Sequence, residues 1–365
     1  MRRHRLILAL SLVVVTGCGS TATSVAPTAS SIPSTVAGSP SPAPTPAPTA
    51  ATTPTPTSTR PPTSTPAPSP SPAPIPSHSG SGGGAIAFAS REGSEWQVYV
   101  MNADGSEPTM ATAGTRGGYE PGWSPDGTKI VFQYGGLQIV DLAAGGILRL
   151  PLAGKSDALP NEYLVKPAWS PDGEWIAFLN ESGTQGDIYL VRPDGTDLRR
   201  LTESDDISRD GNLVWSPDGT KLAYSAVRSG GIEIHVLDVE GAPPGDAAGQ
   251  RLTDSLPPVR NLVTSWSPDG TRLAFSSDRD GNAEIYLMDV DGSDVVRLTN
   301  DPASDTEADW SPDGRLIAFS SDREGNRDIY VLDVAEATQN ADDASVGRLT
   351  DQPGDDVGPA WRPAR

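Results

Sequence analysis

Residues 169–178 read WSPDGEWIAF, and the chain repeats the first five letters of this stretch. The motif WSPDG begins at Trp123, Trp169, Trp215, Trp266 and Trp310, while a sixth tryptophan, Trp361, is followed by Arg-Pro instead of Ser-Pro. Successive members of this set of six tryptophans are 46, 46, 51, 44 and 51 residues apart. A repeat of this length is typical of units built from four short strands, so the motif decides the fold class.

Each repeat has a local structure that its residues predict. In Ser-Pro-Asp-Gly, proline presets φ at the first central position of a turn, aspartate suits the second, and glycine accepts a positive φ. An apolar strand such as KIVF or LIAF follows, then a third strand such as EIYLMD and a fourth that begins with RLT. We interpret the tryptophans and the turn aspartates as structural residues; the aspartates are Asp126, Asp172, Asp218, Asp269 and Asp313.

Six copies of this unit predict an all-β fold, a six-bladed β-propeller of four-stranded antiparallel blades over residues 85–365. The first copy, AIAFAS at residues 85–90, has no tryptophan strand before it, and Trp361 has no further copy after it. We therefore expect the strand that ends at Trp361 to pair with residues 85–88. That pairing would close the ring and remove an exposed sheet edge.

The combined signature, WSPDG…IAFSSDRDGN…IYLMDVDG…RLT, resembles the Pro-Asp (WD-like) repeats of the TolB family of six-bladed propellers. The resemblance covers residues 85–365. It implies the propeller fold and a role in binding partners in the bacterial cell envelope, where TolB acts with a peptidoglycan-associated lipoprotein. TolB carries an α/β domain ahead of its propeller, whereas this sequence has a Pro-rich segment in that place. Similar propellers also occur as gating domains of prolyl-oligopeptidase-like peptidases.

Residues 1–17 have the layout of a secretory signal, with three arginines, an apolar run from Leu6 to Val15, and then small residues. The run is about half of the roughly 20 residues that a membrane-spanning helix needs. Residues 15–18, VTGC, resemble the lipobox of bacterial lipoproteins, which implies acylation of Cys18, the only cysteine in the chain. We therefore predict an exported protein that is anchored by lipid to a bacterial membrane and faces the periplasm or the cell exterior.

Residues 18–84 are predicted to form a disordered tether after the lipidated cysteine. Seventeen prolines lie in residues 19–84, and this stretch contains no aromatic residue. Such a composition cannot bury enough apolar surface to offset the entropy of ordering. The folded part of the chain is expected to be a monomer.

The charge of the chain excludes one class of partner. All 47 acidic residues and 23 of the 27 basic residues lie within residues 85–365. A surface this acidic repels phosphate backbones, so nucleic acid is not an expected partner. The charge can serve solubility alone, or it can favour a cationic partner or a divalent metal.

Candidate catalytic residues are scarce. His4 lies in the predicted signal, His78 in the predicted tether, and His235 at a position where other repeats have tyrosine. Histidine is the usual general base, and no nucleophile motif accompanies it here. We therefore predict that the protein is not an enzyme, with no catalytic or cofactor-binding residue and no cofactor.

A metal site is also not expected. Residues 289–294, DVDGSD, resemble part of an EF-hand loop, but Leu287 stands at the required first ligand position. Asp278 and Asp322 lie in SSDRDGN and SSDREGN, where a carboxylate commonly accepts turn amides.

The segments that differ most between repeats are residues 153–167, 203–212 and 240–250. Loops on a rigid scaffold commonly carry function, although they also collect neutral change. We predict a non-catalytic module that binds a protein or a peptidoglycan-associated envelope ligand through the propeller loops or the channel mouth. The alternative is an envelope polysaccharide lyase or hydrolase with an acid-only or metal-assisted site, and a purely structural spacer is the third hypothesis.

Overall fold

The computed structural model describes residues 84–113, 115, 117–152, 164–182, 185–203, 206–239, 249–342 and 344–364. The predicted signal, Cys18 and nearly all of the predicted tether lie outside these residues, as do residues 153–163 and 240–248 of the variable segments. Within the described part of the chain, no helix is long and apolar enough to cross a membrane.

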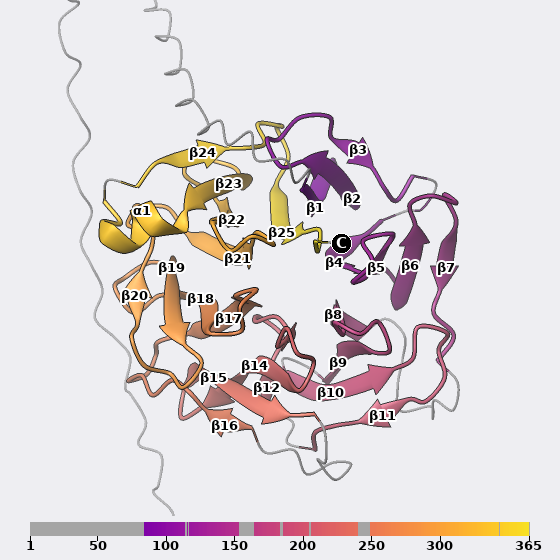
Figure 1. Cartoon of the computed structure of the whole chain (residues 1–365), viewed down its shortest axis with the longest axis horizontal. Helices are drawn as coiled ribbons and strands as arrows, with labels where there is room; N and C mark the ends of the chain where they lie inside the picture. The colour runs from indigo at the N-terminus through magenta and orange to yellow at the C-terminus, as the bar shows by residue number, and fades with distance from the viewer. Residues whose placement is uncertain are drawn as a thin grey trace, which may run out of the picture. The chain divides into compact units, whose positions relative to one another are not determined.

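Four separate sheets have four antiparallel strands each and lie around a common centre (Figure 1). The first consists of β25 (Asp356–Trp361), β1 (Ala85–Glu92), β2 (Glu95–Asn102) and β3 (Thr109–Met110). The second consists of β4 (Tyr119–Trp123), β5 (Lys129–Gln133), β6 (Leu137–Asp141) and β7 (Ile147–Arg149). The others are β17 (Asn261–Trp266), β18 (Arg272–Ser277), β19 (Glu284–Asp289) and β20 (Val296–Arg297), and β21 (Asp305–Trp310), β22 (Leu316–Ser321), β23 (Asp328–Asp333) and β24 (Val346–Arg348).

The remaining strands form one nine-stranded sheet in place of two separate blades. They are β8 (Leu164–Trp169), β9 (Ile176–Ser182), β10 (Gln185–Val191), β11 (Arg199–Arg200), β12 (Ile207–Ser208), β13 (Val214–Trp215), β14 (Lys221–Arg228), β15 (Gly231–Asp238) and β16 (Gln250–Arg251). β12 joins the two halves, because Ile207 pairs with Gly186 of β10 and with Ala226 of β14. The prediction of an all-β propeller with four-stranded blades is confirmed, but the predicted count of six blades is not, because two of the predicted blades share one sheet.

The aromatic position of each repeat forms the core of its sheet. Phe132, Phe178, Phe275 and Phe319 are completely buried. Phe178 stacks on Tyr189 of the next strand with ring centroids 5.7 Å apart, and equivalent pairs recur in four other places. Aromatic rings on paired strands stabilise a sheet beyond the area that they bury, which explains why the repeat keeps this position aromatic.

The RLT segment has a physical role in the fourth strand. The Thr202 hydroxyl accepts the Ile188 N–H at 2.9 Å and donates to Asp187 at 3.0 Å, and Arg200 pairs with Asp187 at 2.6 Å. A threonine accepts a third-strand N–H in the same way in five places: Thr112, Thr202, Thr253, Thr299 and Thr350. These bonds satisfy buried carboxylates and buried amides that would otherwise cost free energy.

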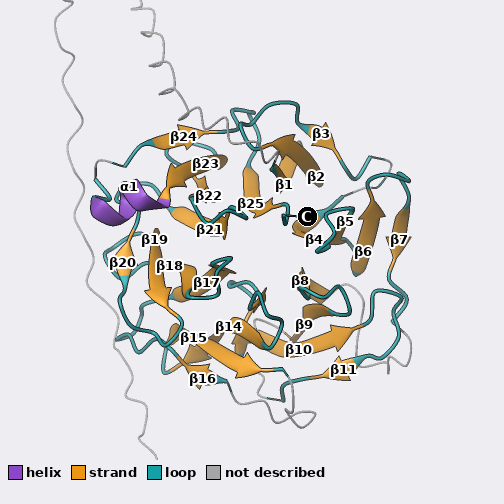
Figure 2. Cartoon of the chain, viewed as in Figure 1, coloured by secondary structure: helices purple, strands orange, loops and turns teal. Residues whose placement is uncertain are grey.

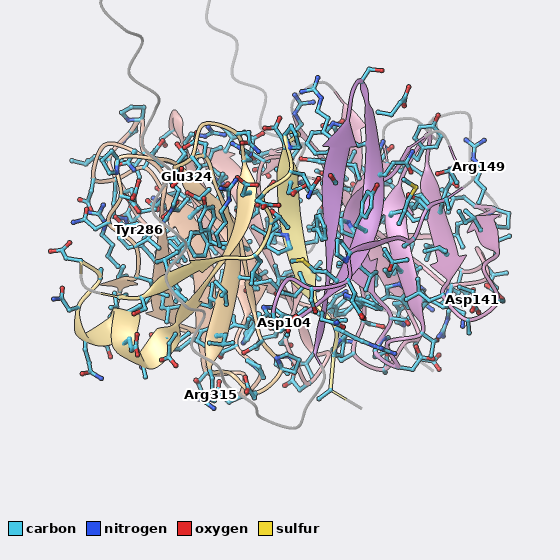
Figure 3. All side chains as sticks on the ribbon, turned by 90° about the horizontal axis from the view of Figure 1, so that it is seen from above. Asp104, Asp141, Arg149, Tyr286, Arg315 and Glu324 are labelled. Carbon is cyan, nitrogen blue, oxygen red and sulfur yellow. The ribbon has the colours of Figure 1, made fainter. Side chains whose placement is uncertain are left out.

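The Ser-Pro-Asp-Gly turns are held by side chains of the motif. In all five turns the serine hydroxyl donates to the aspartate at 2.5–2.6 Å, and the glycine has a positive φ of 62–75°. Hydrogen bonds from Ser124 and Thr128 lower the pKa of Asp126 to about 2. The turns lie on one face of the propeller, as shown by Arg315 directly after Gly314, whereas Glu324 of the β22–β23 loop lies on the other (Figure 3).

The pairing expected at the C-terminal strand is observed. Ile86 pairs with Trp361, and Ala87 pairs with Ala360. Trp361 is 6% exposed and packs in the same cluster as Phe88.

One helical element was not expected from the repeats. Helix α1 (Val334–Gln339) lies at the periphery between β23 and β24 (Figure 2). Asp333 caps it by accepting the N–H groups of Ala335 and Glu336, and Val334 and Ala337 are its buried residues. An aspartate before a run of good helix formers explains this single turn and a half of helix.

Candidate binding site in the central cavity

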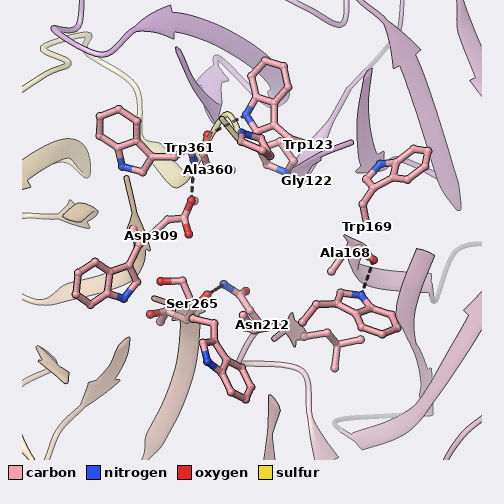
Figure 4. A pocket seen from close by; sticks show the side chains of 18 of the residues that line it. Gly122, Trp123, Ala168, Trp169, Asn212, Ser265, Asp309, Ala360 and Trp361 are labelled. Carbon is pink, nitrogen blue, oxygen red and sulfur yellow. Dashed lines mark hydrogen bonds between the residues drawn. The ribbon is translucent and has the colours of Figure 1, made fainter. Parts of the chain in front are cut away.

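The innermost strands of the sheets surround a cavity of about 600 Å³. All six repeat tryptophans line it: Trp123, Trp169, Trp215, Trp266, Trp310 and Trp361. Prolines of the five Ser-Pro-Asp-Gly turns line it as well, together with Pro363 and Ala364 after the last strand. Figure 4 shows the labelled Trp123, Trp169 and Trp361 around this space.

Two of the six tryptophans, Trp123 and Trp215, connect neighbouring inner strands through their indole N–H groups. The Trp123 indole N–H donates to the Ala360 carbonyl at 3.0 Å, and the Trp215 indole N–H donates to the Ala168 carbonyl at 3.2 Å (Figure 4). Each bond joins a tryptophan to the residue just before the tryptophan of the neighbouring inner strand. The rings therefore form the apolar wall of the cavity and leave little of their surface exposed.

Three charged residues line the cavity, each of them three positions before a repeat tryptophan. Glu120, Lys166 and Glu307 occupy this position in β4, β8 and β21, with φ of 55°, 55° and 56°. The register of each inner strand shifts at this point, which marks a β-bulge. Gly358 occupies the same position in β25 with φ of 60°, which shows that glycine alone can form this bulge.

Lys166 forms the main ion pair of the cavity. Its Nζ lies 2.9 Å from Glu120 Oε1, with side chains 11% and 15% exposed, and its backbone N–H donates to Glu120 Oε2 at 2.7 Å. Burial alone would lower the pKa of Lys166, but the negative charges of Glu120 and Glu307 outweigh it and raise that pKa above its ordinary value. Burial, with the charge of Glu307, raises the pKa of Tyr119 to about 12, so its phenol is neutral at physiological pH.

Two further carboxylates belong to β21. Glu307 Oε2 accepts the Ser320 hydroxyl and the Gly358 N–H, both at 3.0 Å. Asp309 Oδ2 accepts the Trp361 N–H at 2.6 Å (Figure 4). Burial raises the pKa of Asp309 to about 7, although hydrogen bonds from backbone N–H groups oppose this rise. Asp309 is therefore partly protonated at neutral pH.

Comparison with known proteins agrees with this architecture. Residues 246–345 match the family model of the TolB beta propeller domain. The folded part of this chain is therefore similar to TolB β-propellers. It is 34% identical over 159 residues to a protein TolB homolog of Chlorobium luteolum, a match that covers 42% of this chain and 34% of that protein. The matched segment thus spans about a third of this relative.

Solved structures show the same fold at lower identity. TolB from Acinetobacter baumannii superposes with a TM-score of 0.62 at 22% identity, over 77% of this chain and 67% of that one. A tricorn protease superposes with a TM-score of 0.50 at 17% identity, over 74% of this chain and 26% of that one. At these identities the likeness concerns the fold alone.

The residues singled out from the sequence lie mostly in the scaffold of the propeller. His235 of β15 stacks on Tyr224 with centroids 5.5 Å apart and does not line the cavity. Burial lowers its pKa. Asp278 accepts the Arg260 N–H at 2.7 Å, and Asp322 accepts the Ser304 N–H at 2.8 Å. Both carboxylates thus accept backbone amides, but these amides lie 18 residues earlier in the chain and not in the turns of the two aspartates.

Other predictions about sites have varied outcomes. The described residues contain no group of three or more side chains that could hold a metal ion. Cys18 lies outside the described residues, and its acylation stays a prediction. Of the variable segments, 203–212 contributes the joining strand β12 and, through Asn212, part of the cavity wall.

The charged residues of the cavity were missed by the sequence analysis. Glu120, Lys166, Glu307 and Asp309 lie one or three positions before a tryptophan. Aligning the repeats on tryptophan places all four in columns whose other members are neutral. The signal available in the sequence was a charged residue at a position where other repeats have a neutral one.

Proposed function

We propose that this chain is a cell-envelope lipoprotein that displays its propeller as a non-catalytic binding module. In this proposal residues 1–17 are a signal peptide, residues 18–84 carry the acylated Cys18 and a tether, and residues 85–365 form the propeller. We count six blades, with β8–β11 and β13–β16 as two of them, and we place the ligand at the central cavity. The similarity to TolB proteins supports an envelope location.

The cavity is the observation that carries this proposal. Binding sites are typically concave, largely apolar and equipped with a few polar groups that select the ligand. The tryptophan-lined cavity of about 600 Å³ fits this description, with Glu120, Lys166, Glu307 and Asp309 as its charged groups. A protein or a peptidoglycan-associated ligand would reach it from the face that carries the Ser-Pro-Asp-Gly turns.

Site-specific crosslinking tests the place of binding. A photoreactive amino acid at Ala364, which is exposed and lines the cavity, should capture an envelope component in living cells. The same amino acid at Leu148, which is 54% exposed on the outer strand β7, is the matched control. Equal capture from both positions, or none from Ala364, would contradict binding at the cavity.

The lipid anchor is tested separately. Cys18→Ala should move the protein from the membrane fraction to the soluble fraction, since the acyl chains would be lost. Mass spectrometry of the native protein should find an acylated Cys18 as the first residue. An unacylated N-terminus with unchanged membrane retention would contradict the anchor.

The absence of catalysis also has its own test. Purified protein should not turn over esters, peptides or acidic polysaccharides. Reproducible hydrolysis or β-elimination that is lost with a chelator or with His235→Ala would favour the alternative, an envelope lyase or hydrolase.

A further inference from the structure

The charges that line the central cavity are not balanced. They comprise three carboxylates, on Glu120, Glu307 and Asp309, and one ammonium group, on Lys166. Lys166 pairs with Glu120, and no cation of the described residues lies within 4.0 Å of Glu307 or Asp309. Neutral hydrogen-bond donors satisfy part of the two carboxylates, but no cation in the described part of the chain balances their charge, so a cation that enters the cavity gains their attraction.

The bulge does not require these charges. Glu120, Lys166 and Glu307 all have a left-handed backbone at the bulge, with φ near 55°, whereas Gly358 fills the equivalent place. A side chain in this conformation costs free energy relative to glycine, commonly about 1 kcal/mol or more. Residues that keep a charged side chain at such a cost are candidates for function, and here three of them point to one cavity.

A second, independent feature of the wall indicates a ligand. Thr264 is 8% exposed and lines the same cavity, and its hydroxyl has no hydrogen-bond partner among the described residues. A buried hydroxyl of this kind is normally satisfied, and rotation of the Thr264 side chain would bring it to a donor in the cavity.

The kind of cation follows from what the cavity contains. The described residues include no group of three metal-ligating side chains, so a metal ion would lack a protein cage. The cavity already holds a lysine side chain, that of Lys166, with its ammonium at 2.9 Å from a carboxylate. A second lysine side chain therefore matches both the length and the charge that this wall accommodates.

We propose that the cavity binds the ammonium group of a lysine side chain supplied by a partner protein, with Glu307 as the principal carboxylate. This inference rests on the proposed function, because it names the chemistry of the ligand for the same cavity. Asp309 and Thr264 contribute a second acceptor and a hydroxyl. Lys166 competes with the incoming lysine, because its positive charge repels a second ammonium group.

Calorimetry on the full-length protein tests the proposal with a tri-lysine peptide and its Nε-acetylated, uncharged analogue. The charged peptide should bind and the acetylated peptide should not. Glu307→Gln should weaken binding at least about tenfold, the effect of about 1.4 kcal/mol, and Lys166→Met should strengthen it by a similar factor. Glu324→Gln makes the same change of charge at an exposed loop outside the cavity, and it should leave the affinity nearly unchanged.

Several outcomes would overturn the proposal. They are equal binding of the two peptides, equal losses in Glu307→Gln and Glu324→Gln, or no binding to either the native protein or Lys166→Met. Preferential binding of an amino-sugar oligosaccharide over tri-lysine would do so too. If Glu307→Gln proves unfolded in a thermal melt, Lys166→Met and Asp309→Asn provide the same comparison.

The failure of this proposal is distinguishable from failure of the proposed function. The photoreactive amino acid at position 364 can still capture an envelope component while Glu307→Gln leaves that capture unchanged. In that case the cavity binds a ligand but not through a lysine. If the Ala364 probe captures nothing above the Leu148 control, both proposals fail.

Discussion

Two junctions of the propeller connect neighbouring parts of the chain by different means. At the first, β25 is the inner strand of a sheet whose other strands, β1 to β3, come from the opposite end of the described chain. At the second, β12 joins β10 to β14 through only two residues, Ile207 and Ser208. The first junction supplies a strand that its sheet lacks, whereas the second links two halves of one sheet, each of which already has an inner strand.

The difference concerns what each junction buries. Trp361 packs with Ile86 and Phe88, and its ring lies so close to Gly84 that a β-carbon there would be 3.1 Å away. Ile207 is also fully buried, but a two-residue strand offers few backbone hydrogen bonds. We therefore expect the β25 junction to control the stability of the whole domain and the β12 junction to contribute locally.

Removal of β25 should have the largest effect. A chain that ends at Asp355 loses Trp361 and leaves the inner edge of β1 unpaired, which invites aggregation. Truncation of a buried aromatic alone commonly costs about 3–5 kcal/mol, so the protein should melt far below the parent or fail to fold. Deletion of residues 19–79 should leave the melting temperature nearly unchanged, and a stable truncated protein would contradict the assigned junction.

Weakening the β12 junction should have a smaller effect. Ile207→Ala removes a fully buried side chain and should cost about 2–5 kcal/mol, towards the low end because the site lies on a short strand. Chemical denaturation should report this loss, and hydrogen exchange should rise in β10 and β14 more than in β1. Exchange that rises equally in all sheets would show that β12 is as important as β25.

The two junctions also differ in how far the sequence predicts them. The unmatched copies at residues 85–90 and at Trp361 indicated the β25 junction because both are part of the repeat. β12 lies in a segment that no other repeat shares, and its pairing depends on where β10 and β14 lie in space. The sequence analysis missed the cavity charges for a similar reason, because Glu120, Lys166 and Glu307 differ from the residues that the repeat has at these positions.

The link between β21 and β25 should depend on pH. Asp309 accepts the Trp361 N–H, and burial raises its pKa to about 7, so the folded protein holds this proton more tightly than the unfolded chain, where the value is about 4. Its contribution to stability is therefore fully present below pH 4 and is lost as the pH rises towards 7. Asp309→Asn should remove this slope, which melting curves between pH 4 and 8 can measure against Glu324→Gln.

The smallest effect is expected at the end of the β25 junction. The other five repeat tryptophans are followed by a Ser-Pro-Asp-Gly turn, whereas Trp361 is followed by Arg362. The backbone N–H of Arg362 donates to the Ala85 carbonyl at 2.8 Å, and the Arg362 guanidinium lies 5.5 Å from the centroid of the Trp123 ring. A contact of this kind is worth about 0.5–1 kcal/mol at a partly exposed site.

Arg362→Ala should therefore lower the free energy of unfolding by about this amount, measured by denaturant titration. Arg362→Lys keeps the positive charge and should recover part of the loss, because an ammonium group also binds an aromatic face. Since the contact with Trp123 requires the aromatic ring, the effect of Arg362→Ala should disappear in a Trp123→Leu background. An undiminished effect in that background would show that Arg362 acts through its backbone or through other charges.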